Sequence, residues 1–291
     1  IEAVAGEVEK HGFPLVVDPV MIAKSGAPLL KLEARDTLVR RLLPLATVVT
    51  PNAPEAEAIL GVKIRSVEDL KRAAEAISRL GPEAVVAKGG HIGGKEAVDI
   101  LFFKGRFYEF RAPRIESRAT HGTGCSFSAA IAAGLAKGLN VVEAVKEAKR
   151  LITLAVRYGL EIGRGHGPVN PMAVLYVESE KWRTYSRVRE AVDIVESEPL
   201  AARLIPEVGM NIVMALPGAE KTDEVVGIPG RIVRSRGRPR AVSSPEFGGS
   251  SHLARYVIAA MKHSPDVRAA INIRFSTSLV KKLADMGLTV S

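Results

Sequence analysis

The only cysteine of the chain stands at the start of an apolar helical pattern. In the stretch GTGCS, Cys125 follows Gly122 and Gly124, and the apolar run begins after Ser126. Glycines ahead of a helix let several backbone N–H groups turn toward one point, where the helix dipole also favours an anion. A thiolate is favoured at such a position and can take a proton from a substrate hydroxyl. The alternative is a glycine-rich turn followed by a buried, inert cysteine.

Polar residues also follow three predicted strands. FPLVVDP, ATVVTPN and EAVVAKGG have the composition of buried strands, and Asp18, Asn52 and Lys88 lie at or after their carboxyl ends. Ligands bind at this edge of open α/β sheets, and a carboxylate such as Asp18 can hold Mg²⁺ there. Simpler explanations are an Asp-Pro turn for Asp18, a solvated lysine for Lys88, and a helix capping box for Asn52 and Glu55.

The surrounding pattern predicts an α/β domain. Up to about residue 172, short β-branched runs alternate with helical stretches, which indicates βα units on a mostly parallel sheet flanked by helices. Residues 67–80 predict an amphipathic helix, and Lys104-Gly105 predicts the turn of a hairpin. The N-x-x-E pair at 140–143 predicts a capped helix over 141–162.

The order and spacing of the predicted helices and strands change after residue 183, which predicts a second α/β domain. We expect the first domain to span residues 1–173, a linker to span 174–183 and the second domain to span 184–291. The second domain opens with a predicted helix over 184–197 and a strand over 210–216. An amphipathic helix preceded by a glycine pair and serines follows later, and its start favours an anion; the residues there are Gly249, Ser250, Ser251 and His252.

Composition narrows the class of protein. The chain has 291 residues, 47% of them hydrophobic, and one cysteine, so no intramolecular disulfide can form. The N-terminus lacks the features of a signal peptide, and no apolar run approaches the roughly 20 residues of a membrane span. We therefore expect a protein of the reducing cytoplasm. Net charge +9 suits nucleic acid or anionic small molecules. The first residue, Ile1, and the abrupt final segment indicate a fragment at both ends.

Five motifs occur in a characteristic order: VVDPVMIAKSG, VVTPNAPEAEAILG, VVAKGGH, APRIESRATHGTGCSFSAAIAA and GHGPVNP. Together they resemble the hydroxymethylpyrimidine and hydroxymethylpyrimidine-phosphate kinases of thiamine biosynthesis, which have the ribokinase-like fold. In the wider superfamily an Asp usually stands at the position of Cys125, and a cysteine there is typical of the pyrimidine and pyridoxal branch. Roughly the first third of the family's pattern is absent, so the sequence as given is not expected to be a competent kinase.

The resemblance implies ATP and Mg²⁺ as cofactors and a role for each residue. Asp18 and Glu55 would hold or place Mg²⁺, and Lys88 would reach the nucleotide phosphates. Val20 would line the pyrimidine pocket, and His91 is expected to be structural or at the pocket edge. The anion site at the helix start would be formed by Gly122, Thr123, Gly124 and Cys125, with Cys125 accepting the substrate's proton.

An arginine-rich stretch, RIVRSRGRPRAV, leaves several interpretations open. Its five arginines favour anions. The core RGRPR also matches a minor-groove DNA hook, which would make a binding module and not an enzyme. A solvated basic hairpin is the third interpretation, because strand-like segments lie on both sides.

Residues 184–291 resemble the archaeal-type thiamine-phosphate synthase domain through MALPGAEKTDEVVGIPGRIV and FGGSSHLARYVIAAMKHSPDVRAAINIRFS. The resemblance implies condensation of hydroxymethylpyrimidine diphosphate with thiazole phosphate, with Arg231 holding the leaving diphosphate and His252 sharing the phosphate contact. A surface arginine and a helix-capping neighbour are the simpler explanations. The same domain also occurs as a ligand sensor in transcription regulators, which is the alternative function. The expected partners are small molecules, with nucleic acid and membrane not expected and a homo-oligomer left open.

Overall fold

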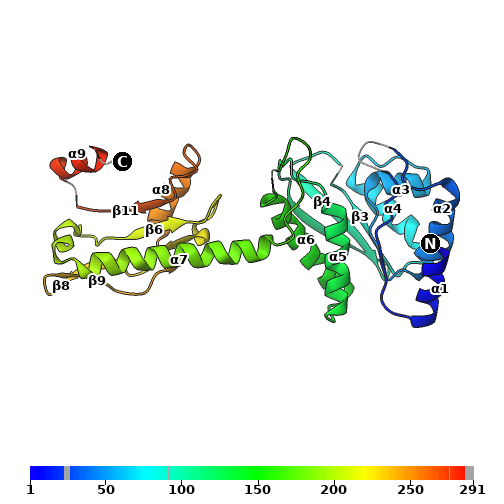
Figure 1. Ribbon diagram of the computed structural model, residues 1–291, viewed down its shortest axis with the longest axis horizontal. Coiled ribbons are helices and arrows are strands. Elements are labelled where there is room, and N and C mark those ends of the chain that lie inside the picture. The colour runs from blue at the N-terminus through cyan, green and yellow to red at the C-terminus, as the bar shows by residue number, and fades with distance from the viewer. Residues whose placement is uncertain (23–26, 91, 161, 275, 286–291) are drawn as a thin grey trace. The chain divides into compact units, whose positions relative to one another are not determined.

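The computed structural model describes residues 1–22, 27–90, 92–160, 162–274 and 276–285 (Figure 1). The chain folds into two compact units, Ile1–Val174 and Leu175–Ser291. Each unit has its own sheet and its own buried core. They are therefore described one at a time.

The first unit contains a five-stranded sheet in the order β1-β2-β3-β4-β5. The first two pairings are parallel, and the other two are antiparallel. The described sheet is thus mixed, which corrects the expectation of a mostly parallel sheet. The strands are β1 (Val16–Val17), β2 (Val48–Val49), β3 (Ala84–Lys88), β4 (Glu96–Phe103) and β5 (Arg106–Pro113).

A tight turn explains the antiparallel edge. Lys104 and Gly105 form the predicted turn between β4 and β5, with φ of 49° and 73°. Two successive residues with positive φ match the right-handed twist of a two-residue hairpin, which can only join antiparallel strands. The predicted hairpin is therefore confirmed, and it accounts for the antiparallel pairing of β4 with β5.

Helices cover both faces of this sheet. Capping boxes at Asn52, Ser66 and Asn140 begin three of them. The helix predicted over 141–162 ends earlier, at Arg157, and the chain then passes so close to Ala119 that a Cβ on Gly159 would be 2.3 Å from the Ala119 Cβ. The α-helices are α1 (Glu2–His11), α2 (Leu32–Thr37), α3 (Ala53–Leu60), α4 (Val67–Ser78), α5 (Thr123–Ala136) and α6 (Val141–Arg157). Two short helices, Leu38–Leu42 and Leu43–Leu45, follow α2.

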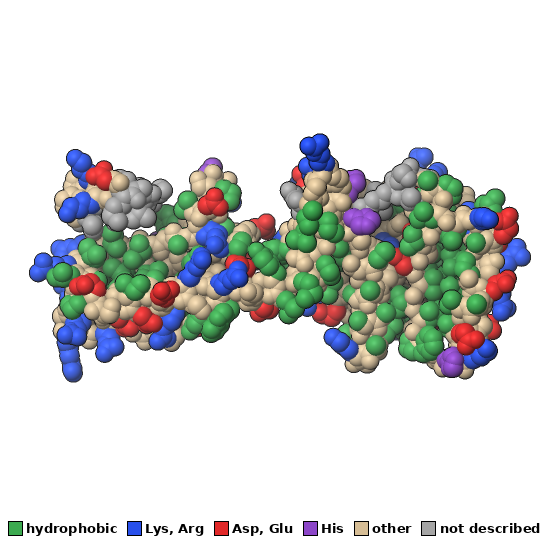
Figure 2. Space-filling view, in the orientation of Figure 1, with side chains coloured by type: hydrophobic (Ala, Val, Ile, Leu, Met, Phe, Trp, Pro, Cys, Tyr) green, Lys and Arg blue, Asp and Glu red, His purple; other side chains and the backbone are tan. Residues whose placement is uncertain are grey.

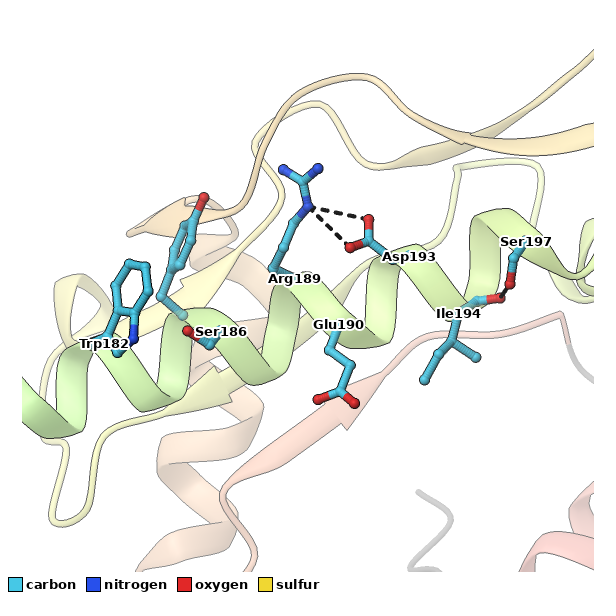
Figure 3. Close-up of a pocket in the computed structure, with 8 residues that line it drawn as sticks. Trp182, Ser186, Arg189, Glu190, Asp193, Ile194 and Ser197 are labelled. Atoms are coloured by element: carbon cyan, nitrogen blue, oxygen red, sulfur yellow. Dashed lines mark hydrogen bonds and ion pairs between the residues drawn. The ribbon is translucent and has the colours of Figure 1, made fainter.

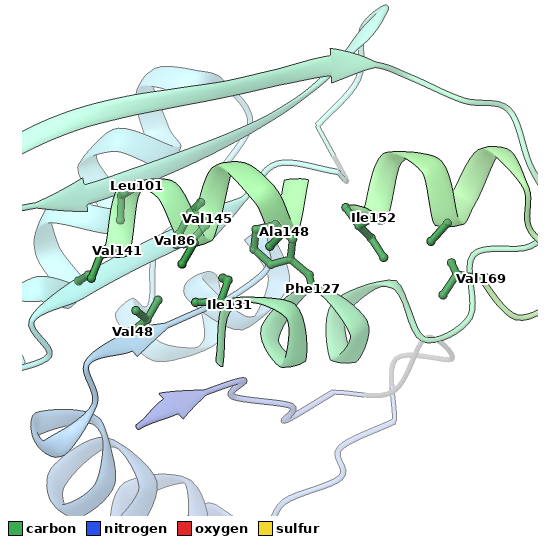
Figure 4. Packing of buried hydrophobic residues seen from close by; sticks show 13 residues of the cluster. Val48, Val86, Leu101, Phe127, Ile131, Val141, Val145, Ala148, Ile152 and Val169 are labelled. Atoms are coloured by element: carbon green, nitrogen blue, oxygen red, sulfur yellow. The ribbon is translucent and has the colours of Figure 1, made fainter. Parts of the chain in front are cut away.

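Strand β3 is buried on both faces, which explains its continuous apolar run. Val86 joins the cluster formed with Phe127 of α5 and Val145 of α6 (Figure 4). Its neighbours Val85 and Ala87 join the opposite cluster, which contains residues of α3 and α4. Since successive side chains of a strand point to opposite faces, one strand anchors both helical layers.

The second unit contains a four-stranded sheet in the order β10-β7-β6-β11, in which every pairing is antiparallel, and a separate hairpin of β8 and β9. Its strands are β6 (Ile212–Ala215), β7 (Val225–Gly227), β8 (Ile232–Ser235), β9 (Arg238–Ala241), β10 (Glu246–Phe247) and β11 (Ala269–Ile271). Its helices include α7 (Ala173–Ser197), α8 (Ser251–Met261) and α9 (Thr277–Asp285), with 3-10 turns at Pro199–Leu204 and Thr222–Glu224.

Helix α7 contains the residues expected to form a linker, and the boundary between the two compact units falls near its start. Residues 174–183 are helical and continue into the helix predicted over 184–197. Ion pairs one turn apart, Lys181 with Glu178 and Arg183 with Glu180, both at 2.7 Å, accompany the helix formers of this segment. Although α7 has 25 residues, no helix in the described part of the chain is long and apolar enough to cross a membrane.

Candidate active site

Two predicted residues meet at the carboxyl edge of the first sheet. Asp18 follows β1 and Lys88 ends β3, and the Lys88 Nζ donates a hydrogen bond of 2.8 Å to Asp18 Oδ1. Their side chains are only 14% and 15% exposed. A largely desolvated ion pair of this kind places one cation and one carboxylate where the sheet presents its ligand edge.

The start of α5 lies against this ion pair. Gly122, with φ of 82°, is the N-cap of α5. A Cβ on Gly124 would be 3.2 Å from the Lys88 Nζ and 3.5 Å from Asp18 Oδ2. Cys125 follows and is exposed, so it is not the buried, inert cysteine of the alternative interpretation. The structure therefore brings Asp18 and Lys88 to the start of α5, which carries the predicted Gly122, Gly124 and Cys125.

The loop before α5 is tied down by backbone and side-chain bonds. His121 N donates to Gly167 O and Val169 N donates to His121 O, both at 3.0 Å, so the GHGPVNP segment braces the helix start. The Thr123 hydroxyl donates to Thr120 O at 2.7 Å. Thr123 thus turns its side chain back to the loop and leaves its backbone N–H at the helix mouth.

Glu55 forms the expected capping box and is 3% exposed. Its Oε2 accepts a hydrogen bond of 2.8 Å from Asn52 N. Burial raises the pKa of the Glu55 carboxyl, while the Asn52 hydrogen bond and the charge of Lys88 act to lower it and the charge of Asp18 acts to raise it. The capping explanation is confirmed, and the carboxyl also lies within the electrostatic reach of the ion pair.

Sequence reasoning missed two buried hydroxyls beside Asp18. Thr50, directly after β2, and Ser128, one turn into α5, lie 2.8 Å apart through their hydroxyl oxygens. The Thr50 Oγ1 is also 3.1 Å from Asp18 Oδ1. The available signals were the place of Thr50 at a strand end and the i+4 spacing of Ser128 from Gly124.

It also missed a second, more deeply buried ion pair behind Lys88. The Lys149 Nζ of α6 donates to Asp99 Oδ2 at 2.7 Å, and Asp99 Oδ1 accepts a hydrogen bond of 3.0 Å from Gly89 N. Asp99 stands opposite Lys88 in the β3-β4 register. A Cβ on Gly89 would be 2.1 Å from Val98 O, so only glycine fits there. The backbone that carries Lys88 is held from both sides.

The oxygen donors of this edge fit Mg²⁺. Mg²⁺ is usually held by one or two carboxylates together with substrate phosphates and water. Asp18 offers Oδ2 on the side that faces α5, and Glu55 supplies a second carboxyl nearby. Within the described residues no three or more His, Cys, Asp and Glu side chains form a group that could enclose a metal by themselves. The donor set thus suits a metal that arrives with a nucleotide.

The remaining residue assigned to this site lies at its edge. Val20 is 42% exposed, and its N–H donates to Asp18 O at 2.8 Å. Its place two residues after Asp18 is compatible with lining a substrate pocket, which stays a prediction. His91 lies outside the described residues.

In the second unit the start of α8 is fitted to the end of β7. A Cβ on Gly249 would be 2.2 Å from Gly227 O, so the close approach requires glycine. Ser250 is the N-cap of α8 but its side chain makes no capping hydrogen bond. The first two helical residues, Ser251 and His252, are exposed, and the His252 ring lies 5.3 Å from that of Tyr256. The helix start therefore presents polar groups to solvent.

Arg231 lies in the loop that follows β7. Its φ is 64°, and its Nη1 donates to Val208 O at 2.7 Å. No hydrogen bond joins Arg231 to His252 in the part of the chain that the structure describes. The end of β7 positions both residues. Gly227 contacts the start of α8, which carries His252, and Ile228 begins the loop that carries Arg231.

Two asparagines missed from the sequence hold this end of the second sheet. The buried Asn211 pairs with the backbone of Ile228 through two bonds, Nδ2 to Ile228 O at 2.6 Å and Ile228 N to Oδ1 at 3.0 Å. Asn272 accepts from Asn211 N at 2.6 Å and donates to Gly209 O at 2.9 Å. Side-chain amides thus take the place of strand pairing where β6 begins and β7 and β11 end.

The arginine-rich stretch is a hairpin. β8 and β9 pair antiparallel around Arg236 and Gly237, which have φ of 49° and 78°. Four of its arginines are exposed, and Lys and Arg side chains gather at the end of the unit that carries β8 and β9 (Figure 2). This confirms the solvated basic hairpin. It disfavours the DNA hook, because a folded turn replaces the open core that would enter a minor groove.

A hollow with a volume of about 580 Å³ lies elsewhere, along α7 (Figure 3). All its lining residues come from this one helix, and its Arg189 is already paired with Asp193. None of the predicted site residues lines it. Because a shallow furrow on one helix offers no convergent polar groups, we assign the site from the charged cluster and not from the hollow.

A mixed sheet between two helical layers, with its ligand edge facing a glycine-started helix, defines a ribokinase-like protein, as predicted. The pyridoxal kinase of Staphylococcus aureus in complex with AMP-PCP and pyridoxal has a similar fold, with a TM-score of 0.55 and 34% identity over 60% of this chain and 63% of that chain. Residues 1–170 match the phosphomethylpyrimidine kinase family, so the chain belongs to that family. Residues 187–291 match thiamine-phosphate synthase ThiN. Both resemblances seen in the sequence are confirmed.

Curated relatives match the first unit. The thiamine biosynthesis bifunctional protein ThiED of Geobacter sulfurreducens is 51% identical over 171 residues, 58% of this chain and 35% of that protein. The hydroxymethylpyrimidine/phosphomethylpyrimidine kinase of Rhizobium meliloti is 49% identical over 173 residues, 58% of this chain and 65% of that protein. The chain spans less than two thirds of the length of either relative.

Proposed function

We propose that the chain performs two steps of thiamine biosynthesis. The first unit would phosphorylate hydroxymethylpyrimidine and its phosphate with ATP and Mg²⁺, giving the diphosphate. The second would condense that diphosphate with thiazole phosphate, giving thiamine phosphate and pyrophosphate. The observation that carries the proposal is the Lys88–Asp18 pair set against Gly124 at the start of α5, in a chain whose other half matches thiamine-phosphate synthase.

The kinase site needs positioning and charge neutralisation more than covalent chemistry. The backbone N–H groups from Gly122 to Cys125 would hold the transferred phosphate at the helix mouth, and Lys88 would neutralise its charge. Asp18 and Glu55 would hold Mg²⁺, which neutralises phosphate oxygens when bound. Cys125, exposed beside the same N–H groups, would take the proton from the substrate hydroxyl.

The synthase site would bind anions on a fixed backbone. Gly249, Ser250 and Ser251 would offer N–H groups at the start of α8, and His252 would share a phosphate. Arg231 would leave its bond to Val208 O and hold the departing diphosphate through two of its guanidinium nitrogens. We place the protein in the cytoplasm with small molecules as partners, and a homo-oligomer stays a prediction.

Paired substitutions test the division of labour. Cys125→Ala should abolish phosphorylation by the full-length protein and leave condensation of supplied diphosphate intact, because the two sites lie in different compact units. Arg231→Ala should do the reverse. Phosphorylation is measured with ATP, Mg²⁺ and hydroxymethylpyrimidine, and condensation with supplied hydroxymethylpyrimidine diphosphate and thiazole phosphate.

Two results would contradict the proposal. Loss of both steps in either variant would show that the residue belongs to folding and not to one reaction. Ligand binding by the second unit without turnover, together with specific DNA retention that salt weakens steeply, would favour the regulatory alternative.

A further inference from the structure

A chain of buried hydroxyls connects α5 to Asp18. The Ser128 Oγ lies 2.8 Å from the Thr50 Oγ1, which lies 3.1 Å from Asp18 Oδ1. Thr50 is fully buried and Ser128 is 7% exposed. The three residues come from the end of β1, the end of β2 and the second turn of α5, so the chain joins the parts that build the site.

The direction of these hydrogen bonds follows from counting protons. Each hydroxyl has one proton, and the Ser128 Oγ is also 3.1 Å from Gly124 O. If Ser128 donated to Gly124 O, Thr50 would have to donate to Ser128, and Asp18 would lose its hydroxyl donor. If Ser128 donates to Thr50, Thr50 can donate to Asp18 Oδ1 at 3.1 Å, which is nearer than its other acceptor, Val17 O at 3.5 Å. The second arrangement is favoured, because a bond to a carboxylate is stronger than one to a neutral oxygen.

In that arrangement the two oxygens of Asp18 have different environments. Oδ1 receives Thr50 and Lys88, the latter at 2.8 Å. Oδ2 faces the position next to Gly124, 3.5 Å from where a Cβ would stand. The carboxylate is therefore held against rotation, because rotation would remove Oδ1 from its two hydrogen-bond donors, Thr50 and Lys88.

We propose that Thr50 and Ser128 are positioning residues for Asp18, holding its carboxylate so that Oδ2 is presented to a metal-bound nucleotide at the start of α5. This inference rests on the proposed kinase function of the first unit. Valine has the same shape as threonine and would fill the same space. The proposed role therefore depends on the hydroxyl of Thr50 and not on the volume of its side chain.

The test compares nucleotide affinity with and without metal. AMP-PCP is titrated calorimetrically into the full chain in excess Mg²⁺ and in EDTA, and the ratio of the two affinities is the gain due to metal. Thr50→Val should reduce this gain by about tenfold, the size of one charge-assisted hydrogen bond. Ser128→Ala should reduce it by about threefold, because Thr50 keeps its bond to Asp18.

Two controls separate positioning from packing. Thr50→Ser keeps the hydroxyl and should restore the gain. Thr153→Val removes a hydroxyl that bonds only to Lys149 O, in α6, and should leave the gain unchanged. Thermal unfolding of each variant is recorded alongside.

The inference is overturned if Thr50→Val binds like the parent protein, if Thr50→Ser is as poor as Thr50→Val, or if the parent protein shows no gain with Mg²⁺. A parent protein that shows the gain but transfers no phosphate to hydroxymethylpyrimidine would instead overturn the proposed function. In that case the ratio for Thr50→Val still decides the role of the hydroxyls.

Discussion

The two candidate sites are built from different kinds of polar group. In the first unit the site is built on two ion pairs, Lys88 with Asp18 and Lys149 with Asp99, supported by the buried hydroxyls of Thr50 and Ser128. In the second unit the buried amide of Asn211 pairs with backbone, while Arg231 donates an exposed hydrogen bond to Val208 O and His252 is exposed. In the first site the charged side chains are thus held in place before a ligand binds. In the second site the backbone is held in place, and we expect the ligand to order the charged side chains.

The largest expected effect comes from breaking the pairing in the first unit. Lys149→Met leaves the Asp99 carboxylate buried without its cation and should destabilise that unit by about 3–5 kcal/mol. Urea unfolding is followed by circular dichroism, and by the fluorescence of Trp182, which is the only tryptophan and lies in α7 of the second unit.

The control for this variant is Lys146→Met, since Lys146 is an exposed lysine of the same helix. It should change stability by no more than about 0.5 kcal/mol. Equal effects of the two substitutions would mean that the buried charges are not coupled. A shift of the Trp182 transition as large as that of the first unit would mean that the units unfold together.

A smaller effect is expected from the amide pairing in the second unit. Asn211→Ala leaves the N–H and C=O of Ile228 without their partner and should cost about 1–3 kcal/mol, because the groups are neutral. The Trp182 transition in urea measures it. Ser197→Ala, which removes an exposed bond to Ile194 O in the same unit, is the matched control. A larger loss than in Lys149→Met would reverse the comparison.

The smallest effect should come from an exposed charge. The pKa of Asp69 is lowered from 3.8 to about 2 by hydrogen bonds from the Arg65 backbone, then from Ser66 and Arg72. Because the folded pKa is depressed, this stabilisation is present above pH 3.8 and is lost as the pH falls through about 2. Asp69→Asn should therefore show a flatter loss of stability between pH 4 and 2, measured by urea midpoints. Parallel curves would rule out the contribution.

Local features of the sequence predicted the fold better than they predicted the site partners. The capping box at Asn140 and the turn at Lys104-Gly105 depend on residues three or fewer positions apart, and both were correct. The pairs Thr50–Ser128 and Lys149–Asp99 join residues 78 and 50 positions apart. No periodicity signals such pairs, because they exist only after sheet order and helix placement are set.

The predicted linker, residues 174–183, is helical and belongs to α7. Residues 174–183 were separated from 184–197 because the composition changes there, yet both segments favour helix and nothing between them stops it. The residues from Gly122 to Cys125 lie at the start of α5, where the family motif places them together. Which group each one touches became visible only in the structure.

The left-handed backbone of Arg231, with φ of 64°, has a consequence for how this position evolves. A non-glycine residue there costs roughly 1–3 kcal/mol, and the exposed bond to Val208 O offsets only part of that. Selection for a stable fold alone would replace this arginine with glycine or asparagine. At this position, selection for stability and selection for a guanidinium group therefore favour different residues.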